Sequence, residues 1–246
     1  MMMKKPLSIA LLILIVLIIV ISGVFFTAPS TPNFQQYPAG KARKAAFFNY
    51  FMPLVTANNQ ERLIIRAKLL DWRDHKNNIG WWDARQIADL AEQYRVTNFV
   101  IDDESSWKKL LIKVDILPLS LVLAQAANES AWGTSRFATS GNNFFGQWCY
   151  KKGCGLVPKK RGSDQEHEVA AFNSPQESLE SYMQNLNSHQ AYKELRAIRA
   201  QLRTNKQTIT GVALSAGLTK YSERGQDYIA ELRAMIKFNK LAKYDK

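Results

Sequence analysis

The chain has 246 residues, of which 33 are basic and 21 acidic, and its formal net charge at pH 7 is +12. This length suits one or two compact domains. The basic residues form no long block and match no groove-reading motif, which argues against nucleic acid as a partner. The excess charge suits anionic lipid or an acidic polymer such as bacterial cell wall, or it is simply a solvated basic surface.

Residues 1–26 are predicted to be a cytoplasmic stub followed by a transmembrane anchor. Lys4 and Lys5 precede an uncharged apolar run over residues 7–26, which as a helix would rise about 30 Å, the thickness of a bilayer core. The run is longer than a signal-peptide core and lacks a small-x-small exit, so we expect it to stay uncleaved. Lysines before the span place the N-terminus inside. In a bacterium the rest of the chain would then lie in the periplasm or cell-wall space, held to the inner membrane.

Residues 27–45 contain three prolines and few aliphatic residues, a composition typical of a flexible linker. From about residue 46 the pattern becomes helical. Ile65, Leu69 and Trp72 follow the i, i+4, i+7 spacing of one helix face. We therefore expect a helical subdomain over residues 46–114 and a second domain over 115–246.

The second domain begins with the stretch LPLSLVLAQAANES, whose Pro118 suits a first helical turn. Small and apolar residues follow on one face, and Glu129 falls at the edge of that apolar arc. Gly133 can end the helix soon afterwards. The sequence thus places one carboxyl group where it is neither fully solvated nor fully buried.

Two short runs over residues 155–159 and 167–172 predict a β-hairpin around a turn-rich segment, and a capping box at Ser174 and Glu177 opens a further helix. Cys149 and Cys154 could close a small disulfide loop in an oxidising compartment. A zinc site is not expected, because no histidine stands at ligand spacing from the cysteines. The predicted fold class is α+β and mainly α.

Glycosidic bond cleavage needs a carboxylic acid whose pKa is raised enough to deliver a proton near neutrality, and a partly apolar site raises it. Glu129 has such a setting, and the aromatic and amide side chains that follow it suit sugar rings and hydroxyls. The plainer alternative is that Glu129 merely ends a helix and that Trp132 and Phe145 belong to the core. From the pattern alone, both interpretations stay open.

The segment LVLAQAANESAWGTSRFATSGNNFFGQW closely resembles the catalytic segment of glycoside hydrolase family 73, the N-acetylglucosaminidases that cut bacterial peptidoglycan. With its apolar N-terminus and the stretch HEVAAFNSPQESLESYMQNLNSHQAY, the chain is similar to the Bax-like branch of that family. The resemblance implies a lysozyme-like domain over residues 115–246 that hydrolyses peptidoglycan glycan strands without a cofactor or a metal.

The resemblance also implies roles for individual residues. Glu129 would be the general acid, Tyr221 would line the cleft, and Glu168 is the choice for a second carboxylate, although Glu166 and the substrate's own 2-acetamido group are alternatives. Candidate sugar contacts are Gln125, Ser130, Trp132, Asn143, Phe145, Gln147 and Trp148.

Two other functions remain open at this stage. A lytic transglycosylase also uses a Glu-Ser pair at a helix end, but it releases 1,6-anhydromuramic ends without water. A tethered wall-binding protein that has lost activity would likewise fit, because the second acid is not evident in the sequence.

Overall fold

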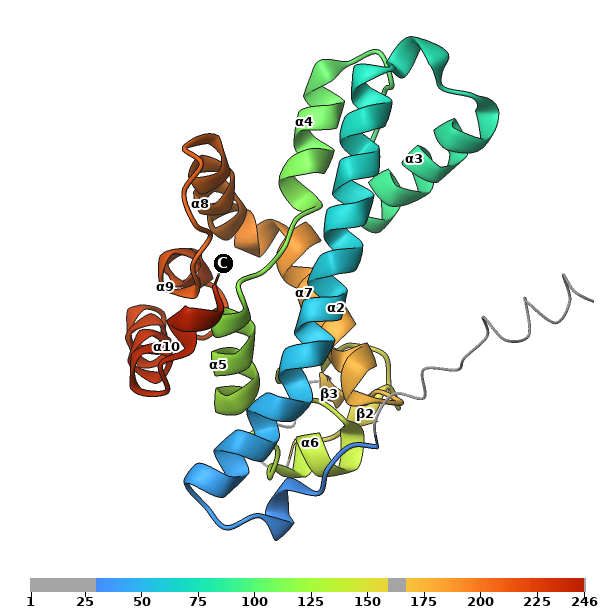
Figure 1. The fold of residues 1–246 in the computed structure, drawn as a ribbon. Coiled ribbons are helices and arrows are strands. Elements are labelled where there is room, and N and C mark those ends of the chain that lie inside the picture. Colours follow the sequence, from blue (N-terminus) through green and yellow to red (C-terminus); the bar gives the residue numbers. More distant parts are fainter. Residues whose placement is uncertain (1–29, 159–166, 246) are drawn as a thin grey trace, which may run out of the picture. The chain divides into compact units, whose positions relative to one another are not determined.

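The computed structural model describes residues 30–158 and 167–245. The membrane span predicted over residues 7–26 lies outside these residues. Within the described ranges, no helix is long and apolar enough to cross a membrane. The chain from Pro32 onward is one compact unit that is mainly helical with a small sheet, as the sequence predicts (Figure 1).

The helices follow one another along almost the entire described chain. The α-helices are α2 (Lys41–Asp74), α3 (Trp81–Gln93), α4 (Glu104–Lys113), α5 (Leu119–Glu129), α6 (Arg136–Gly141), α7 (Pro175–Ser188), α8 (Lys193–Thr204), α9 (Gly211–Leu214) and α10 (Gln226–Phe238). Short 3-10 helices are η1 (Phe34–Gln36), η2 (Lys76–Asn78), η3 (Gln190–Tyr192), η4 (Ser215–Leu218) and η5 (Leu241–Tyr244).

The long helix α2 contributes to two hydrophobic cores. Phe47 and Phe51, near its N-terminus, pack in the larger core with α5, α7 and α10. Leu69 and Trp72, near its C-terminus, pack in a second core with α3 and α4. One continuous helix therefore supports both regions, and they do not separate as independent domains.

The predicted linker over residues 27–45 is shorter in the structure. Residues 34–36 form η1, and α2 already begins at Lys41. Phe34 is only 2% exposed and packs against Phe47, Tyr50 and Phe144, with ring centroids 5.2 to 6.2 Å apart. Burial of this aromatic residue contributes to ordering the segment, as does the hydrogen bond from the Gln35 side chain to the carbonyl of Thr134.

The sheet is small and has the strand order β1–β3–β2. Its strands are β1 (Trp148–Cys149), β2 (Gly155–Leu156) and β3 (Glu168–Ala170). The pairing of β2 with β3 confirms the predicted hairpin, while β1 adds a third antiparallel strand that the sequence pattern did not predict. Cys149 and Cys154 form a disulfide across the loop between β1 and β2.

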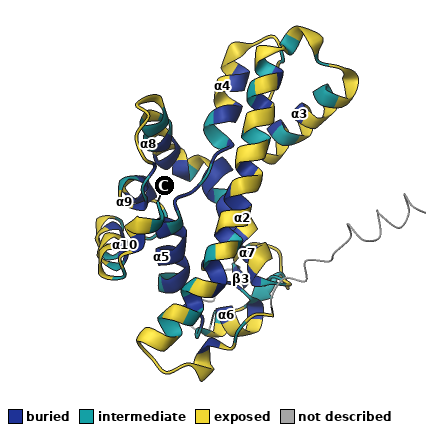
Figure 2. Ribbon diagram, in the orientation of Figure 1, coloured by how far each residue is buried: buried dark blue, intermediate teal, exposed yellow. Residues whose placement is uncertain are grey.

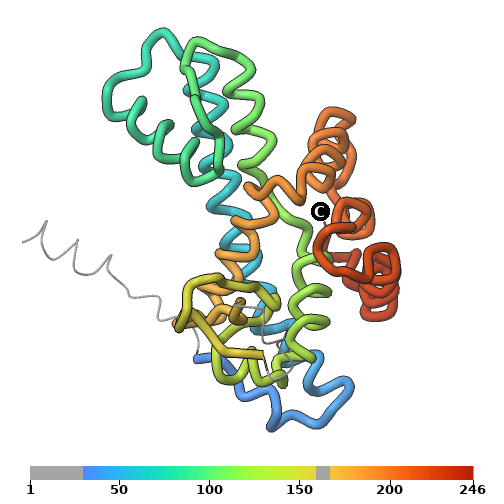
Figure 3. Tube along the Cα trace, turned by 180° about the vertical axis from the view of Figure 1, so that it is seen from behind, coloured from blue at the N-terminus to red at the C-terminus, as the bar shows by residue number. Residues whose placement is uncertain are grey.

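Helix α5 lies at the centre of the larger core, and all its residues from 120 to 127 are buried (Figure 2). It packs against α2 on one side and against α9, α10 and η5 on another, which Figure 3 shows from behind. The sequence predicted a single apolar face, but a helix of small and apolar residues can be buried all round. This burial fixes the position of Glu129 at its C-terminal end.

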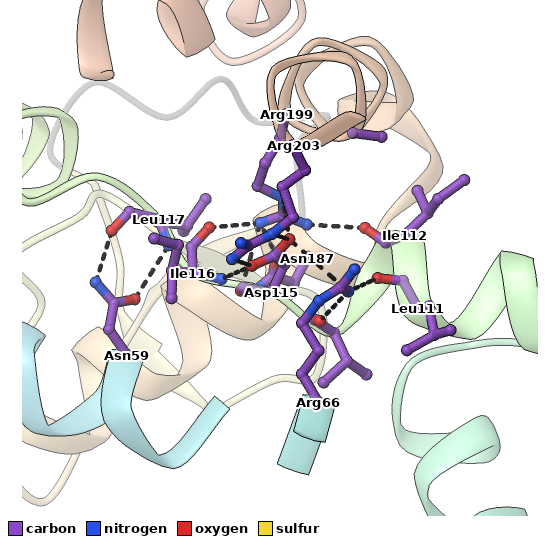
Figure 4. Close-up of polar contacts among 12 residues, drawn as sticks. Asn59, Arg66, Leu111, Ile112, Asp115, Ile116, Leu117, Asn187, Arg199 and Arg203 are labelled. Atoms are coloured by element: carbon purple, nitrogen blue, oxygen red, sulfur yellow. Dashed lines mark hydrogen bonds and ion pairs between the residues drawn. The ribbon is translucent and has the colours of Figure 1, made fainter. Parts of the chain in front are cut away.

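A buried ion cluster joins the two cores at Asp115, where the sequence predicted a domain boundary (Figure 4). Arg203 donates two hydrogen bonds to the carboxylate of Asp115. Arg199 and Arg66 place guanidinium nitrogens 3.9 and 3.8 Å from the same group. These arginines belong to α2 and α8, and Arg66 and Arg199 also donate to backbone carbonyls at the end of α4. The chain is therefore not divided between residues 114 and 115.

Candidate active site

A large pocket with a volume of about 1310 Å³ lies beside the C-terminal end of α5. Its walls come from the loop after α6, the exposed face of α7, the residues around η3 and the segment before α10. The lining residues are Arg95, Glu129, Phe145, Gly146, Gln147, Trp148, Tyr150, Ser181, Gln184, Asn185, His189, Ala191, Tyr192 and residues 219–224. A pocket of this size accommodates several sugar rings.

Glu129 is the last residue of α5 and is half-buried in the wall of this pocket. Its Oε1 accepts a hydrogen bond of 2.8 Å from the hydroxyl of Tyr228. A Cβ atom at Gly146 would lie 3.3 Å from its Oε2, so glycine lets the backbone pass closely over the carboxyl group.

Burial raises the pKa of the Glu129 carboxyl, and the charge of Glu231 adds to this effect. Hydrogen bonds from Tyr228 and Asn128 and the charge of Arg224 lower this pKa, but by less. No cation forms a salt bridge with Glu129 in the described part of the chain. Glu129 therefore holds its proton to a higher pH than an exposed glutamate would.

The end of α5 is fixed by a tight turn. The hydroxyl of Ser130 donates to the carbonyl of Ala126 and accepts from the amide of Gly133. Ala131, Trp132 and Gly133 all have positive φ, at 50°, 60° and 77°. A Cβ at Gly133 would lie 2.3 Å from the Phe34 ring, so this position requires glycine on both counts. The candidate sugar contact Ser130 is 0% exposed and serves this turn.

A chain of buried hydrogen bonds supports Glu129 from behind. Tyr182 donates to the side-chain oxygen of Gln125, and the Gln125 amide donates to the hydroxyl of Tyr228 over 2.9 Å. Gln125 is 0% exposed, so this candidate sugar contact instead orients Tyr228. Burial and the neighbouring carboxylate raise the pKa of Tyr228, which therefore stays a neutral donor.

Sequence reasoning missed Tyr228 and selected Tyr221. The ring of Tyr221 stacks on that of Tyr228 with centroids 5.5 Å apart, and its hydroxyl donates to the carbonyl of Phe145 over 2.8 Å. Burial raises the pKa of the Tyr221 phenol. Tyr221 lines the pocket as expected, but the tyrosine that donates to Glu129 is Tyr228. The sequence marks Tyr228 only as a residue on the buried face of α10.

The loop over residues 143–147 is shaped by its own amides. Asn143 is 1% exposed; it donates to the carbonyls of Gln147 and Ala170 and accepts from the amides of Phe145 and Gln147. The side chain of Gln147 bonds to Ser178 and Ser181 of α7. Asn143 therefore holds the loop in place, while Gln147 both anchors it and lines the pocket.

The predicted aromatic contacts divide into two groups. Phe145 lies on the pocket wall, stacked on Tyr182 at 4.1 Å, and Trp148 is 54% exposed there and stacks on His167. Trp132 does not reach the pocket. Its ring packs against Phe47 and Phe48 of α2 and under Lys44, because the left-handed turn after α5 directs it toward the core.

Glu168 also lies away from the pocket lining. It is 5% exposed, and its two carboxylate oxygens accept the amides of Gly153 and Gly155 at 3.0 and 2.8 Å. This carboxylate orders the disulfide loop. The alternative, Glu166, lies outside the described residues. Among the described lining residues, the only carboxylate besides Glu129 belongs to Glu223.

Among the described residues, one group of side chains lies close enough together to hold a metal ion. Cys149, Cys154 and Glu168 have ligand atoms within 4.8 Å of one another. The disulfide uses both sulfur atoms, so the oxidised chain offers a single carboxylate there.

Three comparisons with known proteins show what the chain is similar to. A family model described as "Glucosaminidase: Mannosyl-glycoprotein endo-beta-N-acetylglucosaminidase" matches residues 104–241. The protein bax of Escherichia coli strain K12 is 37% identical over 214 residues, which cover 85% of this chain and 74% of that protein. Among solved structures, the catalytic domain of the autolysin Auto from Listeria monocytogenes aligns with 86% of this chain and 92% of its own, with 20% identity and a TM-score of 0.44.

Proposed function

The chain belongs to the glucosaminidase family, glycoside hydrolase family 73, and from that premise we propose that it is an endo-β-N-acetylglucosaminidase acting on peptidoglycan. The bond cut is the β-1,4 linkage on the reducing side of N-acetylglucosamine. One observation carries the proposal: the carboxyl of Glu129, whose pKa is raised by burial, lies in the wall of a pocket large enough for a glycan strand.

In this mechanism Glu129 is the general acid. Its Oε1 accepts the Tyr228 hydrogen, so the proton to be delivered resides on Oε2. As the glycosidic bond breaks, this proton passes to the departing sugar oxygen and the carboxylate charge develops beside the Tyr228 hydroxyl. Tyr228 thus holds the acid in one orientation and stabilises its ionised form.

The second step needs a base or an internal nucleophile. Glu223 lines the same pocket and is exposed, which suits a group that activates water. Glu168 already accepts two backbone amides, so we assign it to the loop and not to the reaction. If Glu223 is dispensable, the substrate's 2-acetamido oxygen is the remaining nucleophile for which the pocket has room.

Mass spectrometry of digested peptidoglycan tests the proposal. We expect the full-length chain to release fragments with reducing N-acetylglucosamine ends and Glu129→Gln to release almost none. The control variant is Glu92→Gln, an exposed site outside the pocket lining, which should digest as the wild type does. Fragments ending in 1,6-anhydromuramic acid would instead identify a lytic transglycosylase.

We also propose that the enzyme works from the inner membrane, on the periplasmic or cell-wall side. The support is the apolar run over residues 7–26 behind two lysines. Fractionation should recover the full chain with membranes, and protease added to spheroplasts should degrade its C-terminal part. If the wild-type chain is instead recovered in the soluble fraction because the cell has cleaved off residues 1–26, the anchor is excluded.

A further inference from the structure

A second pocket, of about 380 Å³, continues the candidate active site along α7. Ser181 and Gln184 line both pockets, so the two meet at the exposed face of this helix. Gln184 also donates to the carbonyl of Gln93 at the end of α3, with a distance of 2.7 Å. The second pocket therefore borders the pocket of Glu129 at α7 and lies toward the part of the chain that forms the second core.

The second pocket contains a buried cation that lacks an ionic partner. Arg62 is 6% exposed, and its Nη1 donates to the backbone and side-chain oxygens of Asn58. Its Nε has no hydrogen-bond partner. Tyr94, which lines the same pocket, forms a side-chain hydrogen bond with Arg62. Burial lowers the pKa of Arg62, although Tyr94 and the charges of Glu61 and Glu180 oppose that effect.

Arg66, one turn further along α2, differs from Arg62 because it has an ionic partner. It lies 3.8 Å from Asp115 and donates to two carbonyls. No carboxylate lies within ion-pair distance of Arg62 in residues 30–158 and 167–245. A buried guanidinium without a counterion is costly, and an anionic group from outside would offset that cost.

The rim of the same pocket has the opposite charge. Glu61, Glu177 and Glu180 are all exposed and line it. A ligand that satisfies both features needs a carboxylate for Arg62 and an ammonium group for the rim. N-acetylglucosamine is neutral, and the lactyl carboxyl group of N-acetylmuramic acid is an amide while the peptide is attached, so the sugars of a peptide-bearing strand carry neither charge. A peptide with free carboxylates and an amine carries both.

We propose that the second pocket binds the peptide stem of the glycan strand that lies in the larger pocket. This inference rests on the proposed function, because the stem is attached to the sugar next to the bond that is cut. A stem carboxylate pairs with Arg62 and a stem ammonium lies among the rim glutamates. The enzyme is thereby selective for strands that still carry their peptides.

Two measurements on the full-length chain test this proposal. The first is calorimetric titration with a free stem tetrapeptide that contains a diamino acid. The second compares kcat/KM on glycan strands with intact peptides and on the same strands after an amidase has removed them. Because peptide binding requires no cleavage, the first measurement remains informative even if the chain does not hydrolyse glycan.

The variants are Arg62→Gln and the exposed Glu180→Gln, with Glu92→Gln as the matched control and thermal unfolding as a check on folding. We expect each pocket variant to weaken tetrapeptide binding by about tenfold, the effect of losing a charged hydrogen bond. The preference for peptide-bearing strands should fall equally, while cleavage of peptide-free strands stays unchanged.

Three outcomes would overturn the proposal: no tetrapeptide binding by the wild type, equal cleavage of both substrates by the wild type, or an equal loss on both substrates in folded Glu180→Gln. Failure of hydrolysis is a separate result. If neither substrate is cut but the tetrapeptide binds through Arg62, the proposed reaction is wrong and the peptide site stands.

Discussion

Asp115 and Glu129 are two carboxyl groups in the same fold, yet their surroundings give them opposite properties. Asp115 is 3% exposed and faces three arginines. Glu129 is half-buried and accepts a hydrogen bond from a neutral tyrosine. Both lose hydration, so the difference lies in what replaces the water.

The effect on protonation follows from the partners. Burial would raise the pKa of Asp115, but the hydrogen bonds from Arg203 and the charges of Arg199 and Arg66 outweigh it and lower the pKa. At Glu129 burial is opposed by weaker partners, and the pKa is raised. The first site holds a permanent charge that ties helices together, and the second keeps a proton available for transfer.

Glu129→Gln should produce the largest loss of activity. The amide cannot deliver a proton, so turnover of peptidoglycan should fall by about 10²- to 10⁴-fold. The free energy of unfolding should not fall, because the change removes an acid whose ionised form is disfavoured by burial. Turnover is measured by the release of reducing ends, and stability by thermal unfolding of the same preparation. Retention of more than a tenth of the activity would contradict the assignment.

Asp115→Asn should have the reverse effect. Removing this charge leaves three partly or fully buried arginines without their counterion, and the expected loss is about 3–5 kcal/mol of unfolding free energy. Chemical denaturation measures it, with the exposed Asp102→Asn as control. The molecules that remain folded should keep the pH dependence of the wild type. A loss smaller than that of the control would mean that the cluster does not join the two cores.

Glu168→Gln distinguishes a catalytic role for this residue, which the sequence suggested, from its structural role in the disulfide loop. The amide group of glutamine can accept only through its oxygen, so one of the amides of Gly153 and Gly155 loses its acceptor, at a cost of about 1–3 kcal/mol. We expect lower thermal stability and near wild-type turnover in the folded fraction. If turnover falls a hundredfold while the protein stays folded, the original choice of Glu168 as a second catalytic carboxylate regains its support.

What the sequence predicted well was local. The end of α5, the position of Glu129 and the short loop between Cys149 and Cys154 depend on residues close together in the chain. The capping box at α7 is equally local, with the Glu177 amide bonded to Ser174. Such features follow from helix periodicity, turn residues and spacing, which a single sequence contains.

What it could not predict depends on contacts between distant segments. Tyr228 lies 99 residues from Glu129, and no periodic pattern distinguishes it from Tyr221. Trp132 and Trp148 look alike in the loop sequence, but Trp132 is half-buried against Phe47 at the edge of the core, whereas Trp148 is 54% exposed. The predicted linker was too long for the same reason, because Phe34 packs against aromatic rings that include the distant Phe144.

Tyr228→Phe should reduce the rate less than Glu129→Gln does, and its specific effect should be on the pH dependence. The variant removes a hydrogen bond that favours ionised Glu129, so the pKa of Glu129 rises further. A general acid acts only while it is protonated. The loss of activity at high pH should therefore occur at a higher pH in the variant than in the wild type. The rate at the optimum should decrease by about tenfold, since the carboxyl loses its fixed orientation and Gln125 loses an acceptor.

The pH profile of kcat separates this effect from simple loss of packing. The matched control is Tyr221→Phe, because the Tyr221 hydroxyl bonds to the carbonyl of Phe145 and not to Glu129. In Tyr221→Phe, activity should decline at the same high pH as in the wild type, whatever the effect of the variant on the rate. Two outcomes would contradict this assignment: an equal shift of the high-pH limb in both variants, or a shift to lower pH in Tyr228→Phe. In either case Tyr228 does not control the protonation of Glu129 through their hydrogen bond, and the contrast with the arginine-held Asp115 loses its explanation.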